Sequence, residues 1–188
     1  MAGKEAARRS LISRRTAAPD AGTIATIQVR ASLVAYEHIF PSRSATLTVA
    51  DRTPVWREII ARARGRERVV LAEEAAESCG YAHFGPSRDL DQNPNVMGEL
   101  YSIYVAPEHW RQGVGSKLLV CSMDMLACVG FDACTLWVLT ANNPARRFYE
   151  RHAWRLDGNE KHIDQEIMEV RYRTAGLGRG AANIGVKS

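Results

Sequence analysis

Two glycines stand between a strand-like run and an apolar helical pattern in residues 105–119, VAPEHWRQGVGSKLL. The helix that follows should present unpaired backbone N–H groups near residues 112–116. Such groups favour an anion, and the helix dipole adds to the effect. Gly113 and Gly115 allow positive φ or the close approach of a phosphate, because neither has a Cβ. This segment therefore predicts an anion site between a strand and a helix.

Spacing separates this loop from two nucleotide-binding loops. A dinucleotide GxGxxG fingerprint requires a glycine where this sequence has Leu118. A nucleotide-triphosphate P-loop requires a lysine directly after its last glycine, whereas Gly115 is followed by Ser116 and only then by Lys117. Both patterns fail, so the loop alone indicates either another kind of anion site or an ordinary turn before a helix.

The rest of the chain alternates strand patterns with helical patterns. The order is a strand, two helices, three strands, a helix, a strand, a helix and two strands, which indicates an α/β (α+β) fold with a mixed sheet. The strands are predicted at residues 10–16, 68–75, 79–86, 97–105, 133–139, 153–157 and 167–173. The helices are predicted at residues 20–40, 55–64, 118–129 and 143–152.

Some of these patterns also predict local detail. Asp20 is the expected N-cap of the first helix, and Pro41 ends that helical region. The second helix is expected to follow Pro54 and to bury Trp56. The apolar residues spaced for the inner face of the first helix are Ile24, Ile27, Leu33 and Val34.

Three successive strands are predicted in the middle of the chain. Residues 68–75 and 79–86 are separated by a short polar stretch and are predicted to form a hairpin. Strict alternation in residues 97–105 predicts that successive side chains point to opposite faces of the sheet. One face would carry Leu100, Ser102 and Tyr104, and the other would carry Tyr101, Ile103 and Val105.

Composition is that of a globular protein, with 188 residues of which 46% are hydrophobic and 24% charged. We expect one domain over residues 10–173, a disordered basic tail over residues 1–9 and a flexible tail over residues 174–188. The sequence has no apolar run of membrane-spanning length, and its basic start lacks the apolar stretch of a secretory signal. These features predict a cytoplasmic protein without a membrane partner.

The net charge of +4 gives little support for nucleic-acid binding. Two clusters of basic residues lie near the start of the chain and in residues 62–68, and neither cluster is interleaved with aromatic residues. The cysteines form no CxxC pair and have no nearby His pair at zinc spacing, so we expect reduced thiols and no metal. They are Cys79, Cys121, Cys128 and Cys134.

Two segments together resemble the GNAT superfamily of N-acetyltransferases. The first is WRQGVG, since the family has Arg or Gln, two residues, Gly, one residue and then Gly or Ala; here Trp110 stands at the first position. The second is LWVLTANNPARRFYERHAW, in which Ala153 and Trp154 replace the usual Gly-Phe pair. The residues of the second segment that match in register are Asn142, Ala145, Phe148 and Tyr149.

The resemblance covers roughly residues 10–173 and is strongest over 99–154. It implies a mixed, mostly antiparallel central sheet flanked by helices, and acetyl-CoA as co-substrate without a metal. It also implies that the loop binds the pyrophosphate, chiefly through backbone N–H groups because Trp110 departs from the pattern. The residues expected at the pyrophosphate are Arg111, Gln112, Gly113, Val114, Gly115 and Ser116. Those expected along the pantetheine arm are Ile103, Tyr104, Val105, Asn142, Ala145 and Phe148.

Acetyl transfer to an amine requires a neutral nucleophile, a stabilised oxyanion and a proton for the departing thiolate. By resemblance, Tyr149 protonates the coenzyme A sulfur. Glu99 begins the central strand, and its carboxylate is the candidate for removing the ammonium proton, directly or through water. An ordinary charge at the end of a strand is the alternative interpretation of Glu99.

The expected reaction is direct transfer from acetyl-CoA to an amine on a small molecule or a peptide. The alternative is a non-catalytic sensor or interaction module that binds acyl-CoA on the same fold. A homodimer is possible by analogy with similar proteins. Candidates for lining the acceptor pocket, each of which also has a structural interpretation, are Tyr36, Glu37, His38 and Trp56.

Overall fold

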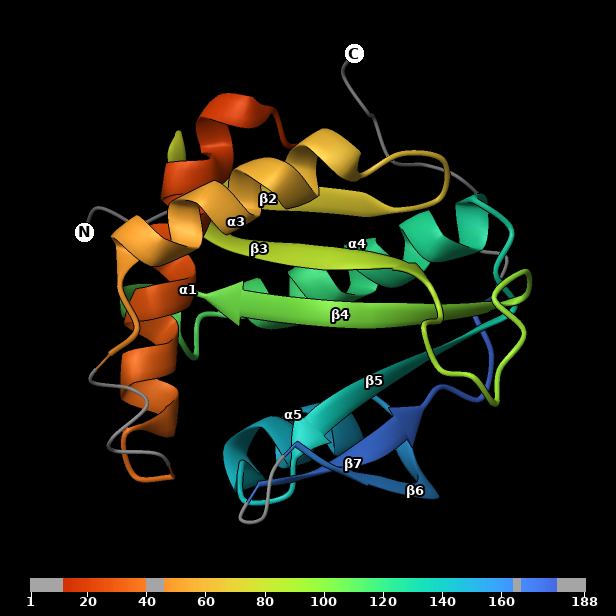
Figure 1. The fold of residues 1–188 in the computed structure, drawn as a ribbon. Helices are drawn as coiled ribbons and strands as arrows, with labels where there is room; N and C mark the ends of the chain where they lie inside the picture. The colour runs from red at the N-terminus through yellow and green to blue at the C-terminus, as the bar shows by residue number, and fades with distance from the viewer. Residues whose placement is uncertain (1–11, 40–45, 164–166, 179–188) are drawn as a thin grey trace, which may run out of the picture.

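A computed structural model of the protein describes residues 12–39, 46–163 and 167–178 (Figure 1). Within these ranges the element order is the one that the sequence predicts. The strands are β1 (Ile12–Arg15), β2 (Arg68–Glu74), β3 (Glu77–Pro86), β4 (Met97–Val105), β5 (Ala133–Leu139), β6 (Arg155–His162) and β7 (Met168–Arg173). The helices are α1 (Ala21–Tyr36), α3 (Val49–Arg62), α4 (Val114–Cys128) and α5 (Asn143–Arg151), with short 3-10 turns at Ala18–Asp20 and Pro107–His109. No helix in the described ranges is long and apolar enough to cross a membrane.

All seven strands form one mixed sheet in the order β1-β2-β3-β4-β5-β7-β6. The β4–β5 pair is parallel and every other pair is antiparallel, which confirms the predicted fold class. The parallel pairing is short, since only Met97–Glu99 of β4 face Ala133–Thr135 of β5. Beyond these residues β4 continues beside β3 while β5 continues beside β7, so the two strands diverge (Figure 1). We call the point of divergence the vertex.

Helices cover the sheet from both sides (Figure 1). On one face α1 and α3 pack against β2 and β3, with Ile24, Trp56 and Tyr81 buried between them. On the other face α4 and α5 form the larger core, to which Leu118 and Tyr149 belong. Apolar side chains on both faces make the central strands buried, as the near-continuous apolar run in β2 indicates.

The first helix is confirmed, but one detail of its predicted inner face is wrong. Ile24 and Ile27 are buried, whereas Leu33 is 38% exposed and Val34 is 52% exposed, because the last turns of α1 extend past the sheet core. Asp20 is the N-cap residue of α1, as predicted, but its carboxylate accepts hydrogen bonds from the Ala17 amide and from Arg14 and none from the first turn of α1. The predicted stop at Pro41 lies outside the described residues.

The second helix begins earlier than the sequence analysis predicts. α3 starts at Val49, so Pro54 lies inside it. Thr48 is the N-cap: its hydroxyl accepts from the Asp51 amide at 3.1 Å and donates to the Asp51 carboxylate at 2.6 Å. This reciprocal cap starts the helix before the proline, which then lacks only one N–H donor.

A β-bulge interrupts the predicted alternation in β4. His83 of β3 faces Ser102 and Phe84 faces Leu100, which leaves Tyr101 as an extra residue. Because the bulge changes the phase of the strand, Leu100 joins the core under α4 with the side chains of Ile103 and Val105. Tyr104 packs on the opposite face with the α1–α3 cluster. The prediction that Leu100 and Tyr104 share a face is therefore wrong.

The last two strands differ from prediction in their bounds. β6 begins at Arg155 instead of residue 153, because Ala153 has φ +63 and turns the chain out of α5. It extends to His162 as an exposed edge strand whose polar residues give no apolar pattern. After β7 the Leu177 amide donates to the Asp132 carbonyl at 2.7 Å. The domain boundary at residue 173 stays a prediction, and residues 1–9 and 179–188 of the predicted tails lie outside the described ranges.

Candidate active site

The vertex and the loop after β4 mark the two ends of one strand. Past Glu99, the edge of β4 that faces β5 has no strand partner, so backbone groups along this edge are available to a ligand. Val105 ends the strand, and the glycine loop leads from there into α4. A ligand placed along this edge would reach the vertex at one end and the start of α4 at the other.

The glycine loop has the geometry that the sequence predicts. Gly113 is the N-cap of α4 with φ +82, a conformation that glycine adopts without strain. Val114, Gly115 and Ser116 form the first turn, where amide groups have no partner within the helix, and no side chain caps them. Arg111 also has a positive φ, of +60. The first turn of α4 therefore offers a row of free N–H groups to an anion.

Side chains around the loop define how closely a ligand approaches it. A Cβ added to Gly115 would lie 3.6 Å from the Phe148 ring and 3.7 Å from the Val105 side chain. Gly115 thus lies against α5, and Ala145 of the same helix packs on the same core. The Gln112 side chain donates to the Glu108 carbonyl at 2.7 Å and so stabilises the loop itself.

Trp110, which departs from the resemblance, folds back onto β4. Its indole N–H donates to the Val105 carbonyl at 2.6 Å, and the residue is 37% exposed. This bond occupies one of the backbone groups expected to contact a pantetheine arm. The N–H groups of the loop are left untouched by Trp110.

Asn142 is 8% exposed and serves as the N-cap of α5, since its side-chain oxygen accepts from the Ala145 amide at 3.2 Å. Its match to the family pattern thus has a structural basis in this chain. Any contact with pantetheine would use its side-chain NH₂ or its backbone.

Tyr149 is 8% exposed and lies among other aromatic residues. Its ring centroid is 6.0 Å from that of Trp154 and 6.3 Å from that of Tyr172. Burial raises the pKa of the Tyr149 phenol well above its ordinary value, and nearby Tyr104 and Cys134 add to the shift. The phenol is therefore neutral at physiological pH and carries a proton that it can donate.

Glu99 is buried at the vertex, with 3% of its surface exposed. One carboxylate oxygen accepts from the Arg88 backbone amide at 2.8 Å, and the other accepts from the Arg88 guanidinium at 2.6 Å. The Arg88 guanidinium also lies over the Tyr101 ring, 3.8 Å from its centroid. Glu99 thus has an ion-pair partner that the sequence analysis did not identify.

Glu99 and Tyr149 lie on opposite faces of the sheet. The Arg88 guanidinium contacts both Glu99 and the Tyr101 ring. Tyr101 packs edge-on against His83, and His83 packs against Trp56 of α3, so Glu99 lies on the face that α1 and α3 cover. Tyr149 belongs to the core under α4 and α5. We call the space between the diverging parts of β4 and β5 the split. A group bound in the split would therefore face a carboxylate from one side and a phenol from the other.

Among the predicted acceptor residues, Tyr36 and Trp56 have defined contacts. The Tyr36 hydroxyl lies 3.3 Å from that of Tyr104, which places the end of α1 over the β4 strand. Trp56 is 2% exposed, donates to the Gln28 side chain at 2.8 Å and belongs to the core, so it cannot line a pocket. Glu37 and His38 follow α1 in a turn.

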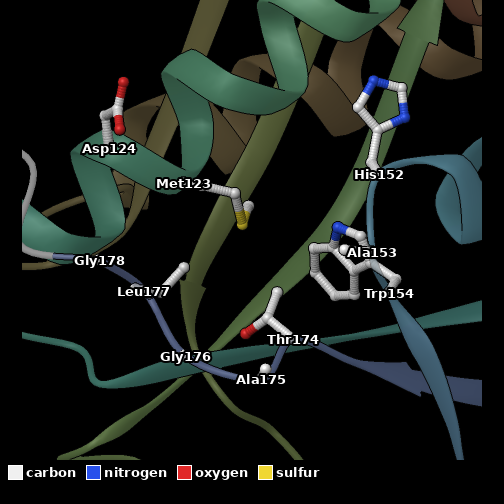
Figure 2. Close-up of a pocket in the computed structure, with 10 residues that line it drawn as sticks. All are labelled: Met123, Asp124, His152, Ala153, Trp154, Thr174, Ala175, Gly176, Leu177 and Gly178. Atoms are coloured by element: carbon white, nitrogen blue, oxygen red, sulfur yellow. The ribbon is translucent and has the colours of Figure 1, made fainter.

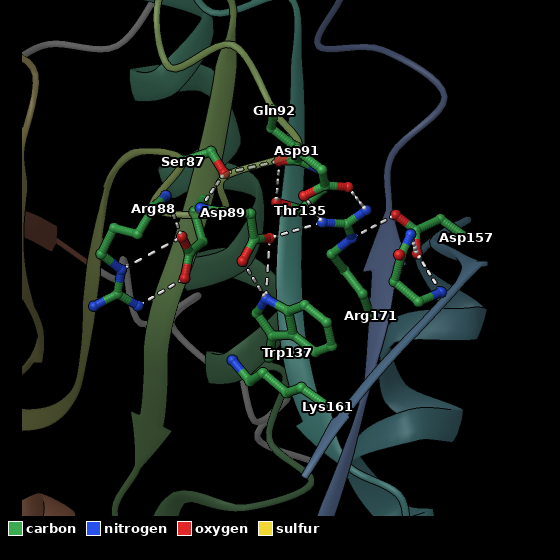
Figure 3. A network of polar contacts seen from close by, with 12 residues as sticks. Ser87, Arg88, Asp89, Asp91, Gln92, Thr135, Trp137, Asp157, Lys161 and Arg171 are labelled. Atoms are coloured by element: carbon green, nitrogen blue, oxygen red, sulfur yellow. Dashed lines mark hydrogen bonds and ion pairs between the residues drawn. The ribbon is translucent and has the colours of Figure 1, made fainter. Parts of the chain in front are cut away.

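A network of charged residues adjoins the vertex (Figure 3). Arg171 of β7, 3% exposed, forms ion pairs with Asp89 at 3.0 Å, Asp91 at 2.7 Å and Asp157 at 2.6 Å. Asp89 also accepts from the Trp137 indole at 3.0 Å. Sequence analysis missed this network because its members come from a loop and three strands, with no shared motif.

The described residues also enclose a cavity of about 220 Å³ (Figure 2). It lies between α4, the turn after α5 and the segment after β7, and it contains no residue of the predicted site. Its lining includes Met123, Asp124, His152, Trp154 and Thr174. In the part of the chain that the structure describes, no group of three or more His, Cys, Asp and Glu residues is arranged to hold a metal ion.

Comparison with known proteins agrees with the fold and the loop. Residues 34–154 match the model of the Acetyltransferase (GNAT) family. The uncharacterized N-acetyltransferase YuaI of Bacillus subtilis is 34% identical over 109 residues, which are 58% of this chain and 60% of YuaI. A mycothiol acetyltransferase of Clavibacter michiganensis is 35% identical over 79 residues, 42% of this chain and 23% of that protein. The chain thus spans less than two thirds of the length of these curated relatives.

The solved structures show the same fold. PaiA N-acetyltransferase from Thermoplasma acidophilum, in complex with coenzyme A, superposes with a TM-score of 0.70 at 16% identity. The superposition covers 86% of this chain and 98% of that one.

Proposed function

This chain belongs to the GNAT acetyltransferase family, and we propose that it transfers the acetyl group of acetyl-CoA directly to an amine. One observation carries the proposal. The unpaired edge of β4 connects the free N–H groups at the start of α4 with a vertex that has Glu99 on one face and Tyr149 on the other. This arrangement supplies an anion site, a strand edge along which an extended arm can bind, and two groups for proton transfer.

The loop residues fit a pyrophosphate. The N–H groups of Val114, Gly115 and Ser116 would donate to phosphate oxygens, and the dipole of α4 would stabilise their charge. Arg111 and Gln112 flank the same turn. The absence of a Cβ on Gly115 lets the first turn of α4 pack closely on Phe148, since a Cβ there would lie 3.6 Å from that ring.

The pantetheine arm would lie along β4 beyond Glu99. The backbone of Ile103 would face the arm there, whereas the Tyr104 carbonyl lies against Gly80 of β3 and the Val105 carbonyl is engaged by Trp110. Ala145 and Phe148 would form the wall on the α5 side. The thioester would then lie near the vertex, within the split between Glu99 and Tyr149.

Transfer would proceed in one complex of protein, acetyl-CoA and amine. The neutral amine attacks the thioester carbonyl carbon, forming a C–N bond and a tetrahedral oxyanion. Collapse of this intermediate breaks the C–S bond, and Tyr149 gives its proton to the departing thiolate. Glu99 would accept the proton that the ammonium must lose, directly or through water. Burial raises the pKa of Tyr149 and so makes the phenol a weaker acid, which means that its proposed role rests on its position beside the departing sulfur.

One observation favours a second candidate, a module that binds acyl-CoA without catalysis. Both carboxylate oxygens of Glu99 are engaged by Arg88, so the site as it stands has no free base. Thiol release from acetyl-CoA separates the two functions. The enzyme releases coenzyme A faster when a suitable amine from a panel of small molecules and peptides is added. If acetyl-CoA binds and every amine leaves the rate unchanged, the binding module is the better account.

An amine acceptor, a homodimer and a cytoplasmic location are parts of the same proposal. Acceptors would reach the thioester from the Glu99 face, since α4 and α5 cover the other face. An amine on a small molecule or on a peptide fits this approach.

A further inference from the structure

An exposed cation lies on a buried carboxylate at the vertex. The Arg88 side chain is 61% exposed, whereas that of Glu99 is 4% exposed. The guanidinium contacts Glu99 at 2.6 Å and lies 3.8 Å from the centre of the Tyr101 ring. A carboxylate next to the face of an aromatic ring is a recognition site for an organic cation. In this structure the protein's own arginine fills that site.

The backbone of Arg88 has contacts of its own, separate from those of its solvent-exposed side chain. Its amide donates to Glu99 at 2.8 Å, a bond that does not depend on the guanidinium. The next residue, Asp89, is held by Arg171 and by the Trp137 indole (Figure 3). The loop therefore stays in place when the Arg88 side chain rotates into solvent, and Glu99 keeps one hydrogen bond.

The surrounding charges favour a cation as the replacement. Asp89, Asp91 and Asp157 all pair with a single guanidinium, that of Arg171, so this cluster has more negative than positive charge. This excess of negative charge would repel a carboxylate on the ligand and attract an ammonium group. Because Glu99 is buried, its carboxylate needs a cation beside it, and another cation could replace the solvent-exposed guanidinium without leaving that charge unpaired.

We infer that Arg88 is a displaceable occupant of the acceptor's ammonium site, and that the acceptor is a cationic amine without a neighbouring carboxylate. The inference rests on the proposed function, because it takes the vertex as the acceptor site. When the acceptor's ammonium group displaces the guanidinium, it lies on Tyr101 and next to Glu99. The same exchange frees one Glu99 oxygen to accept the ammonium proton, so only bound substrate releases the base.

The test is an NMR-detected titration with 1,5-diaminopentane, read at the backbone amides of Glu99 and Tyr101. It compares the wild-type protein with Arg88→Met, and it is run with and without coenzyme A. Arg62→Met is the matched control, since Arg62 forms an exposed ion pair with Glu58 on α3, away from the vertex. Removing the internal competitor should tighten binding about three- to tenfold in Arg88→Met and leave the control unchanged.

A second ligand and two further variants make the result decisive. 5-Aminopentanoate has the same chain length with a carboxylate at one end, and it should bind more weakly than the diamine in both proteins. Adding Glu99→Gln to Arg88→Met should abolish the shifts at the vertex. Arg88→Gln repeats the measurement if Arg88→Met does not fold.

The inference is overturned if diamine affinity is unchanged or lower without the Arg88 side chain, or if no shift occurs at Glu99 and Tyr101. It is also overturned if the loss of Arg88 weakens 5-aminopentanoate binding, because Arg88 would then recruit an anionic acceptor. A protein that binds the diamine in this way but does not bind coenzyme A would contradict the proposed function alone.

Discussion

Glu99 and Tyr149 lie on opposite faces of the sheet, on either side of the split between β4 and β5. A thioester in the split would receive the amine from the Glu99 face and release its thiolate toward Tyr149. The two proposed proton transfers would thereby take place on different sides of the thioester.

Gly115 gives the most direct test of the phosphate loop. Gly115→Val should weaken acetyl-CoA binding about tenfold or more, because the branched side chain would press on Phe148 and Val105 and shift the first turn of α4 away from the proposed pyrophosphate position. Gly115→Ala is the control for folding, since its Cβ meets only ordinary contacts, the nearest at 3.6 Å. Calorimetry measures both affinities. Undiminished affinity in the valine variant would remove the loop from the binding site.

Ala153→Gly should stabilise the protein by about 1 kcal/mol. Ala153 has φ +63, a left-handed conformation that costs a non-glycine residue about that much. The family pattern has glycine at this point. Urea denaturation gives the free energy of unfolding. Ala61→Gly, within helix α3, should have the opposite sign, and a destabilising Ala153→Gly would contradict the explanation.

The hairpin between β2 and β3 provides an independent case of the same strain. Glu74 pairs with Glu77, and the two residues between them, Ala75 and Ala76, have φ +52 and +67. Turns of this kind favour Asn followed by Gly. Ala75→Asn combined with Ala76→Gly should therefore raise the melting temperature, and an unchanged or lower melting temperature would contradict the strain.

Arg171 should be among the most sensitive positions for stability. Arg171→Met leaves three carboxylates without their shared partner and should destabilise the protein by about 3–5 kcal/mol in urea denaturation. Arg62→Met, which removes an exposed ion pair, should change the free energy of unfolding by less than about 1 kcal/mol. Equal effects of the two substitutions would show that the network contributes little.

His83 should make stability depend on pH. Burial lowers the pKa of His83, and this outweighs the opposite effect of Glu67, which accepts its Nε2–H at 2.7 Å. Glu99 also raises the pKa and Arg88 lowers it. The unfolded chain binds a proton near pH 6.5 while the folded protein resists it, so stability falls as the pH drops below about 6.5.

Urea denaturation at pH 7, 6 and 5 checks this dependence. His83→Phe keeps an aromatic ring next to Trp56 and Tyr101 and removes the titrating group. The variant should lose less stability on acidification than the wild-type protein. A steeper loss in the variant would contradict the assignment.

Local patterns in the sequence predicted the element order, the sheet class and the glycine loop, because strand and helix periods and glycine conformations are local properties. The bulge at Tyr101 was not predictable, since the residues on either side alternate without interruption. The start of α3 at Val49, capped by Thr48, was missed because Pro54 gave a stronger apparent signal.

The partners of the candidate site were less accessible to sequence analysis. Arg88 is distant from Glu99 by 11 positions, and Arg171 is 80 and more from Asp91 and Asp89. No spacing rule links such residues, because a loop and separate strands bring them together. Trp110 was recognised only as a departure from the family's loop pattern. Its hydrogen bond to the Val105 carbonyl depends on how the loop folds back onto β4, which the sequence does not reveal.

The central claim is that Tyr149 donates the proton to the departing thiolate. The most direct measurement is the steady-state rate of amine-dependent thiol release by Tyr149→Phe, together with its acetyl-CoA affinity by calorimetry. The substitution keeps the packing of the ring on Trp154 and Tyr172 and removes only the hydroxyl. We predict a fall in kcat of about 100-fold or more, with acetyl-CoA affinity changed by less than about twofold. Unchanged turnover in this variant would contradict the account.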